Sequence, residues 1–247
     1  MGKITTKELL DAGVHFGHLT RKWDPRMAPN IFMERNGIHI IDLNKTAVAL
    51  ENAKTALTQI AKSGRKIMFV ATKKQAQVRV SEEAKKLKMP FVTERWLGGM
   101  LTNFATVRKS IKRMSSIEKM EKDPDFAKNI AKRERLMLSR EKGKLERVIG
   151  GIAELNRLPA ALFIIDVKKE HLAIKEAHKL GLPIFALVDT NSNPDVVDHA
   201  IPGNDDSAKS IDLIVSHISQ AIEAGLSERK KEKDTKSEKT EVKAEEA

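Results

Sequence analysis

The 247-residue chain contains no cysteine and no tyrosine, and aromatic residues make up only 4% of it. Without cysteine the chain forms no disulfides and offers no thiolate to a metal or a substrate. With so few aromatic rings it lacks the stacking platforms by which proteins read single-stranded RNA. No apolar segment approaches the roughly 20 residues that span a bilayer, and the first residues lack the apolar stretch of a signal peptide. We therefore expect a soluble cytoplasmic protein without a membrane partner.

Positive charge is abundant and unevenly distributed. The 45 Lys and Arg residues exceed the 34 Asp and Glu residues, which gives a net charge of +11. Residues 46–158 carry +14, whereas residues 159–226 carry −5. Cations grouped in this way favour a nucleic acid as partner over a surface that lysine merely keeps soluble. Duplex RNA, which is recognised through its shape and its phosphates, fits this composition better than single-stranded RNA.

Short apolar runs alternate with amphipathic segments along the chain. The apolar runs predict buried strands over residues 66–72, 91–92, 160–166 and 184–188. The amphipathic segments predict helices over residues 6–12, 44–63, 76–87, 171–180 and 207–224. A hairpin is predicted over residues 31–41, with Asn36-Gly37 at its turn. Continuous apolar strands separated by helices predict an α/β fold in which helices flank a parallel sheet.

Residues 105–158 interrupt this alternation with a basic segment of heptad-like periodicity. The segment contains 15 Lys and Arg against 8 Asp and Glu. Its apolar spacing predicts two helices that pair as an antiparallel coiled-coil hairpin, with a break at Asp123-Pro124. Gly98 and Gly99 precede the insertion and are predicted to form its hinge, because glycine tolerates a positive φ angle. We expect the hairpin to project from the α/β body.

The predicted organisation has four parts. Residues 1–104 form the first part of the α/β domain and include an irregular contact loop at residues 14–30. Residues 105–158 form the hairpin, and residues 159–226 form the second part of the α/β domain. Residues 227–247 contain seven basic and seven acidic residues with no apolar periodicity, which predicts a disordered tail.

Two short motifs invite an enzymatic interpretation. His15-Phe16-Gly17-His18 and Arg113-Met114-Ser115-Ser116 are similar to the two signature motifs of class I nucleotidyltransferases. In those enzymes the first motif follows a buried strand, whereas here it follows a polar helix, and the second falls inside the predicted coiled coil. The strand at 66–72 leads into Lys73-Lys74-Gln75 rather than a glycine-rich phosphate loop. We therefore expect no enzyme activity and no cofactor.

Acidic and amide side chains cluster after the predicted strand at 184–188. Asp189 and Asp205 are the candidates there for binding a hard cation. Their spacing matches no EF-hand-like loop, and Asx side chains commonly form turns and helix caps instead. We expect no metal site, and metal binding at Asp189 and Asp205 is the weaker alternative.

The residues expected to contact RNA are basic, aromatic or histidine side chains outside the predicted core. Trp23 and Trp96 each have a cation nearby, which suits contact with a base or a ribose, although a buried tryptophan that anchors a loop is equally consistent with the sequence. The histidines have the same two interpretations, contact with RNA or support of the loop. The candidates are His15, His18, Arg21, Lys22, Trp23, Lys73, Lys74, Arg95, Trp96, Arg108, Lys109, Lys112, Arg113, Lys132, Arg133 and Arg135.

Six segments together carry a resemblance to a known family. They are His15–His18 with Trp23–Met27, Gly37–Leu43, Thr72–Ala76, Arg95–Phe104, Asp189–Pro194 and Ile201–Asp206. On these segments the chain resembles the bacterial small-subunit ribosomal protein S2 family. The resemblance covers about residues 5–226, and the block Arg95–Phe104 is its most specific part.

The resemblance implies an α/β domain with a protruding coiled-coil hairpin. It also implies a structural constituent of the small (30S) ribosomal subunit that binds 16S rRNA and lies beside other small-subunit proteins. In that setting the chain would help to recruit the large mRNA-binding ribosomal protein S1, and we expect no homo-oligomer. The alternatives are a free RNA-binding or chaperone protein and, much more weakly, a nucleotidyltransferase-like enzyme.

Overall fold

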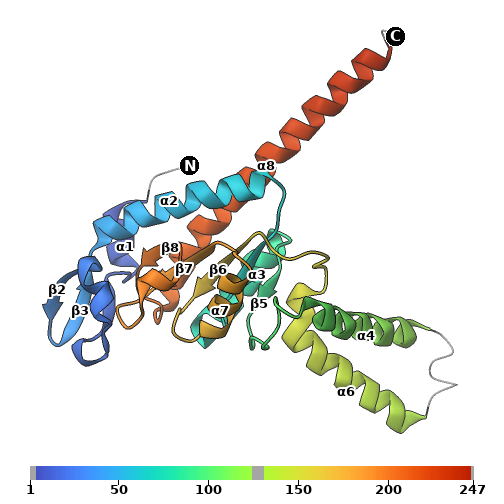
Figure 1. Cartoon of the computed structure of the whole chain (residues 1–247), viewed down its shortest axis with the longest axis horizontal. Coiled ribbons are helices and arrows are strands. Elements are labelled where there is room, and N and C mark those ends of the chain that lie inside the picture. Colours follow the sequence, from blue (N-terminus) through green and yellow to red (C-terminus); the bar gives the residue numbers. More distant parts are fainter. Residues whose placement is uncertain (1–3, 124–130, 246–247) are drawn as a thin grey trace.

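A five-stranded parallel sheet forms the centre of the molecule (Figure 1). The computed structural model describes residues 4–123 and 131–245. The strands are β4 (Ile67–Val70), β5 (Phe91–Val92), β6 (Ala161–Ile165), β7 (Ile184–Val188) and β8 (His199–Pro202). They lie in the order β5-β4-β6-β7-β8, and each neighbouring pair is parallel. The predicted α/β fold with a parallel sheet is therefore confirmed.

Both faces of the sheet are buried, because successive side chains of a strand point to opposite sides. In β4, Ile67 and Phe69 belong to one hydrophobic cluster, and Met68 and Val70 belong to another. The helices that cover the sheet are α2 (Leu43–Lys62), α3 (Lys74–Lys86), α7 (His171–Lys179) and α8 (Ala208–Glu245). Apolar residues of α2, α3 and α8 contribute to the first cluster, and those of α7 contribute to the second. This double burial explains why the strands read as continuous apolar runs.

A second, smaller sheet lies at the amino-terminal end of the molecule (Figure 1). The elements of this region are α1 (Thr6–Asp11), β1 (Phe16–Leu19), the 3-10 helices η1 (Thr20–Lys22) and η2 (Pro25–Asn30), β2 (Ile31–Arg35) and β3 (Ile38–Ile41). The strands are antiparallel in the order β1-β3-β2, which confirms the predicted hairpin at residues 31–41. The expectation of an irregular loop at residues 14–30 is corrected, because β1 pairs with β3. Only four residues long and centred on glycine and histidine, β1 has no alternation that reveals it.

Two helices leave the sheet between β5 and β6. They are α4 (Phe104–Lys122) and α6 (Lys132–Ile149), which lie side by side and extend away from the body (Figure 1). Ion pairs join them, with Arg113 Nε 3.0 Å from Glu141 Oε1 and Lys142 Nζ 2.7 Å from Glu121 Oε2. At Asp123 α4 ends as predicted, whereas Pro124 lies outside the described residues. After α6 the short η3 (Gly150–Ile152) returns the chain to the sheet.

The last helix differs from the prediction. The sequence predicts a helix end at Gly225 and a disordered tail from residue 227, but α8 continues to Glu245. A Cβ atom at Gly225 would lie 2.5 Å from the Thr58 carbonyl oxygen, so this glycine allows α8 to approach α2 closely rather than stopping the helix. Beyond it, Lys62 of α2 pairs with Glu232 at 2.7 Å. The prediction is therefore wrong for residues 225–232, because α2 supports this part of the helix.

Candidate functional site

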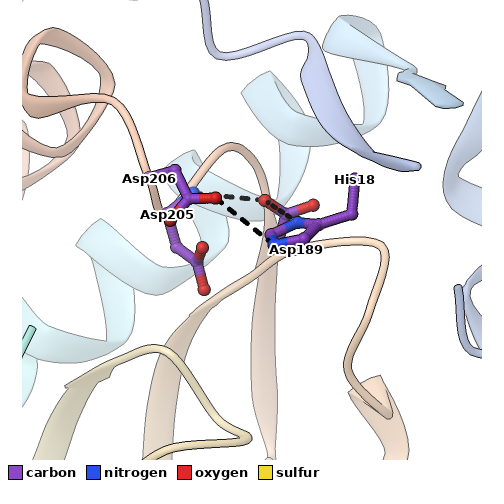
Figure 2. Close-up of side chains that lie close together, drawn as sticks. All are labelled: His18, Asp189, Asp205 and Asp206. Carbon is purple, nitrogen blue, oxygen red and sulfur yellow. Dashed lines mark hydrogen bonds and ion pairs between the residues drawn. The ribbon is translucent and has the colours of Figure 1, made fainter. Parts of the chain in front are cut away.

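Charged side chains from distant parts of the sequence meet at the carboxyl-terminal edge of the parallel sheet. Figure 2 shows His18 of β1 beside Asp189, which follows β7, and Asp206, which precedes α8. The Nδ1 atom of His18 lies 3.0 Å from Asp189 Oδ2, and its Nε2 atom lies 3.3 Å from Asp206 Oδ2. Asp205 lies beneath them and is fully buried. The fold thus brings together His18, Asp189 and Asp205, three residues that the sequence singled out separately.

Lys73, the N-cap residue of α3 in the connection after β4, completes this cluster. Its Nζ atom lies 2.6 Å from Asp205 Oδ1, 2.6 Å from Asp206 Oδ1 and 3.6 Å from Asp166 Oδ2. The Lys73 side chain is only 12% exposed. An ammonium held by three carboxylates has little charge left to offer to a phosphate, so these ion pairs favour an internal role for Lys73. Contact between Lys73 and RNA stays a prediction.

Burial and charge move the pKa values of the two neighbouring carboxyls in opposite directions. Burial raises the pKa of Asp205 to about 7, together with the charges of Asp189 and Asp166 and against the effect of Lys73. Burial alone would raise the pKa of Asp206 as well, but its side chain is 54% exposed. At this exposed position the hydrogen bond and charge of Lys73 outweigh the effect of burial, so the pKa of Asp206 is lowered. The buried Asp205 is therefore protonated more easily than the exposed Asp206.

The histidine of the cluster is held in place by the loop after β7. The hydrogen bond to Asp189 raises the pKa of His18, although burial opposes this shift. The backbone N–H of His18 donates to Thr190 Oγ1 at 2.8 Å. A Cβ atom at Gly17 would lie 2.6 Å from Thr190 Cγ2, so the close approach of the two loops requires glycine. This close contact explains why the motif has glycine at position 17, directly before His18.

The cluster also has the chemistry of a cation site. Ligand atoms of His18, Asp189, Asp205 and Asp206 all lie within 4.8 Å of one another. Imidazole nitrogen and carboxylate oxygen are typical ligands of zinc and related divalent ions. The other interpretation of the sequence, turn formation by Asx side chains, applies to the neighbouring Asn204. Its Oδ1 atom accepts hydrogen bonds from the backbone N–H groups of Asp206 and Ser207. Metal binding at Asp189 and Asp205 stays a prediction.

The other histidine of the motif is not part of the cluster. His15 packs its ring 4.0 Å from that of Phe16, and burial lowers the pKa of His15. Its segment lies in the small antiparallel sheet rather than after a buried parallel strand, and residues 113–116 lie inside α4. Neither motif therefore has the setting that a nucleotidyltransferase requires.

A single carboxylate organises the turn that leads from the sheet to α4. Glu176 of α7 accepts hydrogen bonds from the Trp96 indole N–H at 3.0 Å and from the backbone N–H groups of Gly99 at 2.8 Å, Leu101 at 2.9 Å and Thr102 at 3.1 Å. Burial would raise the pKa of Glu176, but these donors outweigh it and lower the pKa. Sequence reasoning missed Glu176, because a glutamate on an amphipathic helix has the pattern of a solvated side chain.

The same turn bears on Trp96 and on the predicted hinge. Trp96 is 6% exposed and donates to Glu176, which favours the interpretation of a buried tryptophan that anchors the turn over contact with RNA. Gly99 has a φ angle of +84°, as the predicted hinge requires. Gly98 has no positive φ, and a Cβ atom there would meet no atom within 4 Å. Of these two residues, only Gly99 therefore has a backbone conformation that requires glycine.

Most of the remaining candidates lie on the surface. On α4, Arg108, Lys109 and Lys112 are exposed, whereas Arg113 is exposed but forms two hydrogen bonds with Glu141. On α6, Lys132 and Arg133 are exposed, and Arg135 is partly buried. The exposed candidates on the body are Arg21, Lys22, Trp23, Lys74 and Arg95. The Trp23 ring lies 5.1 Å from the His39 ring and is 39% exposed.

Comparisons with known proteins identify the family. The family model described as "Ribosomal protein S2" matches residues 9–225. The chain is similar to the Small ribosomal subunit protein uS2 of Cytophaga hutchinsonii, with 68% identity over 232 residues that cover 94% of this chain and 91% of the relative. It is 61% identical to the uS2 protein of Flavobacterium johnsoniae, with 94% and 91% covered, and 60% identical to that of Chlorobaculum tepidum, with 89% and 88% covered. Within the described residues, no helix has the length and apolar character to cross a membrane. The chain belongs to the ribosomal protein S2 family.

Proposed function

We propose that the chain is a structural constituent of the small ribosomal subunit, where it binds 16S rRNA. Membership of the ribosomal protein S2 family is the observation that carries this assignment, since the relatives at 60–68% identity are small-subunit proteins. The role is structural rather than enzymatic. Its place of action is the ribosome, and its contribution to translation is to shape and hold the particle.

The contact with RNA is made by the arm, which we define as α4 and α6. Arg108, Lys109 and Lys112 lie on the first helix, and their side chains are exposed. No carboxylate of the described residues lies within 4.0 Å of any of these three cations. Such cations release counterions from RNA phosphates on binding. The two helices act as an antiparallel coiled coil, which gives the cations a rigid support away from the sheet.

Reversal of these charges tests the arm directly. In the full chain, the variant Arg108→Glu, Lys109→Glu, Lys112→Glu should bind 16S rRNA more than tenfold more weakly at 0.1 M salt, in a filter-binding assay. The slope of log K against log salt should become less steep by up to about 0.9 for each phosphate that the variant no longer neutralises. Arg113 is left intact, because its change would break the pair with Glu141 inside the arm.

A control variant separates position from net charge. Lys168, Lys175 and Lys209 are exposed residues of the acidic part of the chain. Changing all three to Glu alters the net charge by the same amount, and this variant should keep the affinity of the wild type. Equal weakening of RNA binding in the two variants would refute a contact through the arm.

We further propose that the chain helps to recruit ribosomal protein S1 to the small subunit. Apolar side chains are exposed along the small sheet, with Phe32 at 70% and Met33 at 49% exposure. A protein partner would cover such side chains at an interface. Small subunits that carry Phe32→Ser and Met33→Ser should retain less S1 when sedimented at low concentration, whereas Val78→Ser, an exposed residue on α3, should have no effect. Unchanged S1 retention would argue against this surface.

A further inference from the structure

A second charged feature lies on the opposite edge of the parallel sheet from the His18–Lys73 cluster. A cleft of about 820 Å³ opens where β4, β5 and β6 begin, between the end of α3 and the end of α6. Its lining residues fall within three segments, 64–66, 85–91 and 146–158, and not every residue of the last two contributes. The cleft therefore lies at the base of the arm, where the arm joins the body.

Cations dominate the lining of this cleft. Two carboxylates, Glu146 and Glu154, face six cationic side chains. The six are Arg65, Lys66, Lys85, Lys88, Arg147 and Arg157. All six are exposed, and no carboxylate of the described residues lies within 4.0 Å of any of them. This contrasts with Lys73 on the other edge, whose charge is matched by three carboxylates.

The contacts that these cations do make leave their charge available. Lys66 Nζ donates to the Lys88 carbonyl oxygen at 2.5 Å, and Arg65 Nε donates to Ser63 Oγ at 3.3 Å. Lys85 Nζ lies 5.7 Å from the centre of the Phe91 ring. Each contact fixes the direction of a side chain without neutralising it, so an anion that enters the cleft meets partly oriented donors.

Stabilisation of helix ends does not account for the whole set. Lys85 and Arg147 lie in the last turns of α3 and α6, where a cation favours the negative end of the helix. Lys88 directly follows the C-cap of α3, and Arg65 lies two residues past the C-cap of α2, so both can also favour a helix end. Arg157 lies in the connection to β6, well past the end of α6, where no helix end explains its charge. Helix ends also do not explain why cations from three segments gather around one cleft.

The walls of the cleft are formed by packed backbone. A Cβ atom at Gly151 would lie 2.2 Å from the Phe91 carbonyl oxygen, so η3 is in close contact with β5. Met89 and Leu155 of the lining are buried, with 4% and 6% of their surfaces exposed. The cleft thus has a firm apolar floor below a cationic rim, and it exists before any ligand binds.

The cations of the arm continue into this cleft. On α6, Arg133, Arg140, Lys144 and Arg147 are spaced by 7, 4 and 3 residues, which places them on one face of the helix. All four side chains are exposed, and Arg147 is part of the cleft. A row of cations that ends in a cationic cleft suits a polymer with repeated phosphates better than a single small anion, which needs donors that converge on one point.

We propose that this cleft binds the sugar–phosphate backbone of RNA, in continuity with the cationic face of α6. The inference rests on the proposed role in the small subunit, and it adds a second contact surface at the base of the arm. The rim cations contact successive phosphates, and the apolar floor packs against a ribose face. Charge complementarity, rather than any reading of bases, holds the strand there.

The test is the salt dependence of rRNA binding by the full chain. The variant Arg65→Gln, Lys88→Gln, Arg157→Gln removes three rim charges and leaves Lys66 in place. If each charge neutralises one phosphate, the slope of log K against log salt should become less steep by about 2.7, because each phosphate contributes about 0.9. At 0.1 M salt this amounts to roughly eightfold weaker binding for each phosphate that the variant leaves unneutralised. The control variant Lys168→Gln, Lys175→Gln, Lys209→Gln has the same net charge and should match the wild type.

The outcomes distinguish this inference from the proposed function. Wild-type binding that the arm variant loses but the cleft variant retains with an unchanged slope would overturn the cleft proposal alone. Absence of rRNA binding by the wild type would overturn the proposed function. Stabilisation of the wild type by free nucleotide in a thermal-unfolding assay, abolished in the cleft variant while its rRNA slope stays unchanged, would assign the cleft to a small anion and refute the RNA contact. An unchanged thermal midpoint shows that the variant is folded.

Discussion

Replacing Glu176 by glutamine should loosen the junction between the body and the arm. The carboxylate accepts hydrogen bonds from Trp96, Gly99, Leu101 and Thr102, and both of its oxygens are in use. Glutamine keeps the shape but replaces one oxygen with an NH2 group. That group then faces N–H donors, so at least two hydrogen bonds are broken whichever way the amide turns.

The size of the effect follows from the burial of the donors. Trp96 and Leu101 are 6% and 2% exposed, so a donor left unpaired there receives little compensation from water. An unsatisfied buried donor costs about 1–3 kcal/mol, and hydrogen bonds to charged groups are stronger than neutral ones. Glu176 itself is half-buried, which reduces the destabilisation. We expect Glu176→Gln to lower the free energy of unfolding by about 2–4 kcal/mol.

Urea unfolding followed by tryptophan fluorescence is a suitable assay, because Trp96 is one of only two tryptophans and lies at the altered contact. The pKa of Glu176 is lowered in the fold, so its stabilising effect is present above the pKa of unfolded glutamate, about 4.3, and disappears as the pH falls through the folded-state pKa. The difference between wild type and variant should therefore be full at pH 7 and shrink below about pH 4. Glu82→Gln on the exposed side of α3 is the control. A Glu176→Gln variant as stable as this control at pH 7 would refute the reasoning.

Three further perturbations follow from the structure. Gly99→Val should destabilise the chain by about 1–2 kcal/mol or more because of the positive φ, whereas Gly98→Val should be tolerated. Urea unfolding compares the two variants, and equal destabilisation would contradict the conclusion that only Gly99 requires glycine. The pKa of Asp205 is raised to about 7 from about 3.9 in the unfolded chain, so this carboxyl makes the fold less stable as the pH rises through that range. The stability of Asp205→Asn relative to wild type should therefore increase from pH 5 to pH 7.5, and a decrease would contradict the shift. Gly225→Val should lower the thermal midpoint, because the added side chain forces α8 away from α2. Gly143→Ala, in open space on α6, should instead raise the free energy of unfolding by about 0.8–1.0 kcal/mol. Similar effects of the two variants would refute the close contact between α8 and α2 at Gly225.

The parallel sheet could be predicted because the sequence of each of its central strands is itself sufficient to identify the strand. Ile67–Val70 and Ala161–Ile165 are buried on both faces, so each is a continuous apolar run that needs no tertiary information. Gly225 shows the limit of such reasoning. The same residue type ends helices and permits close helix contact, and only the presence of α2 decides between the two.

The site was harder to predict, because its electrostatics depend on partners far away in the sequence. Lys73 lies 132 residues from Asp205, and in the sequence it reads as one of two adjacent exposed cations. The fold buries Lys73 among carboxylates and leaves Lys74 exposed. The cationic cleft was missed for a related reason: its lysines and arginines come from three separate segments that only the packing of η3 on β5 brings together.

Sedimentation of cell lysate through a sucrose gradient tests the central claim most directly. A tagged wild-type chain should travel with the small ribosomal subunit, and the variant Arg108→Glu, Lys109→Glu, Lys112→Glu should shift to the top of the gradient while remaining folded. The control with Lys168, Lys175 and Lys209 changed to Glu should sediment as the wild type does. A wild-type chain found only at the top, as a free RNA-binding protein would be, would contradict the account.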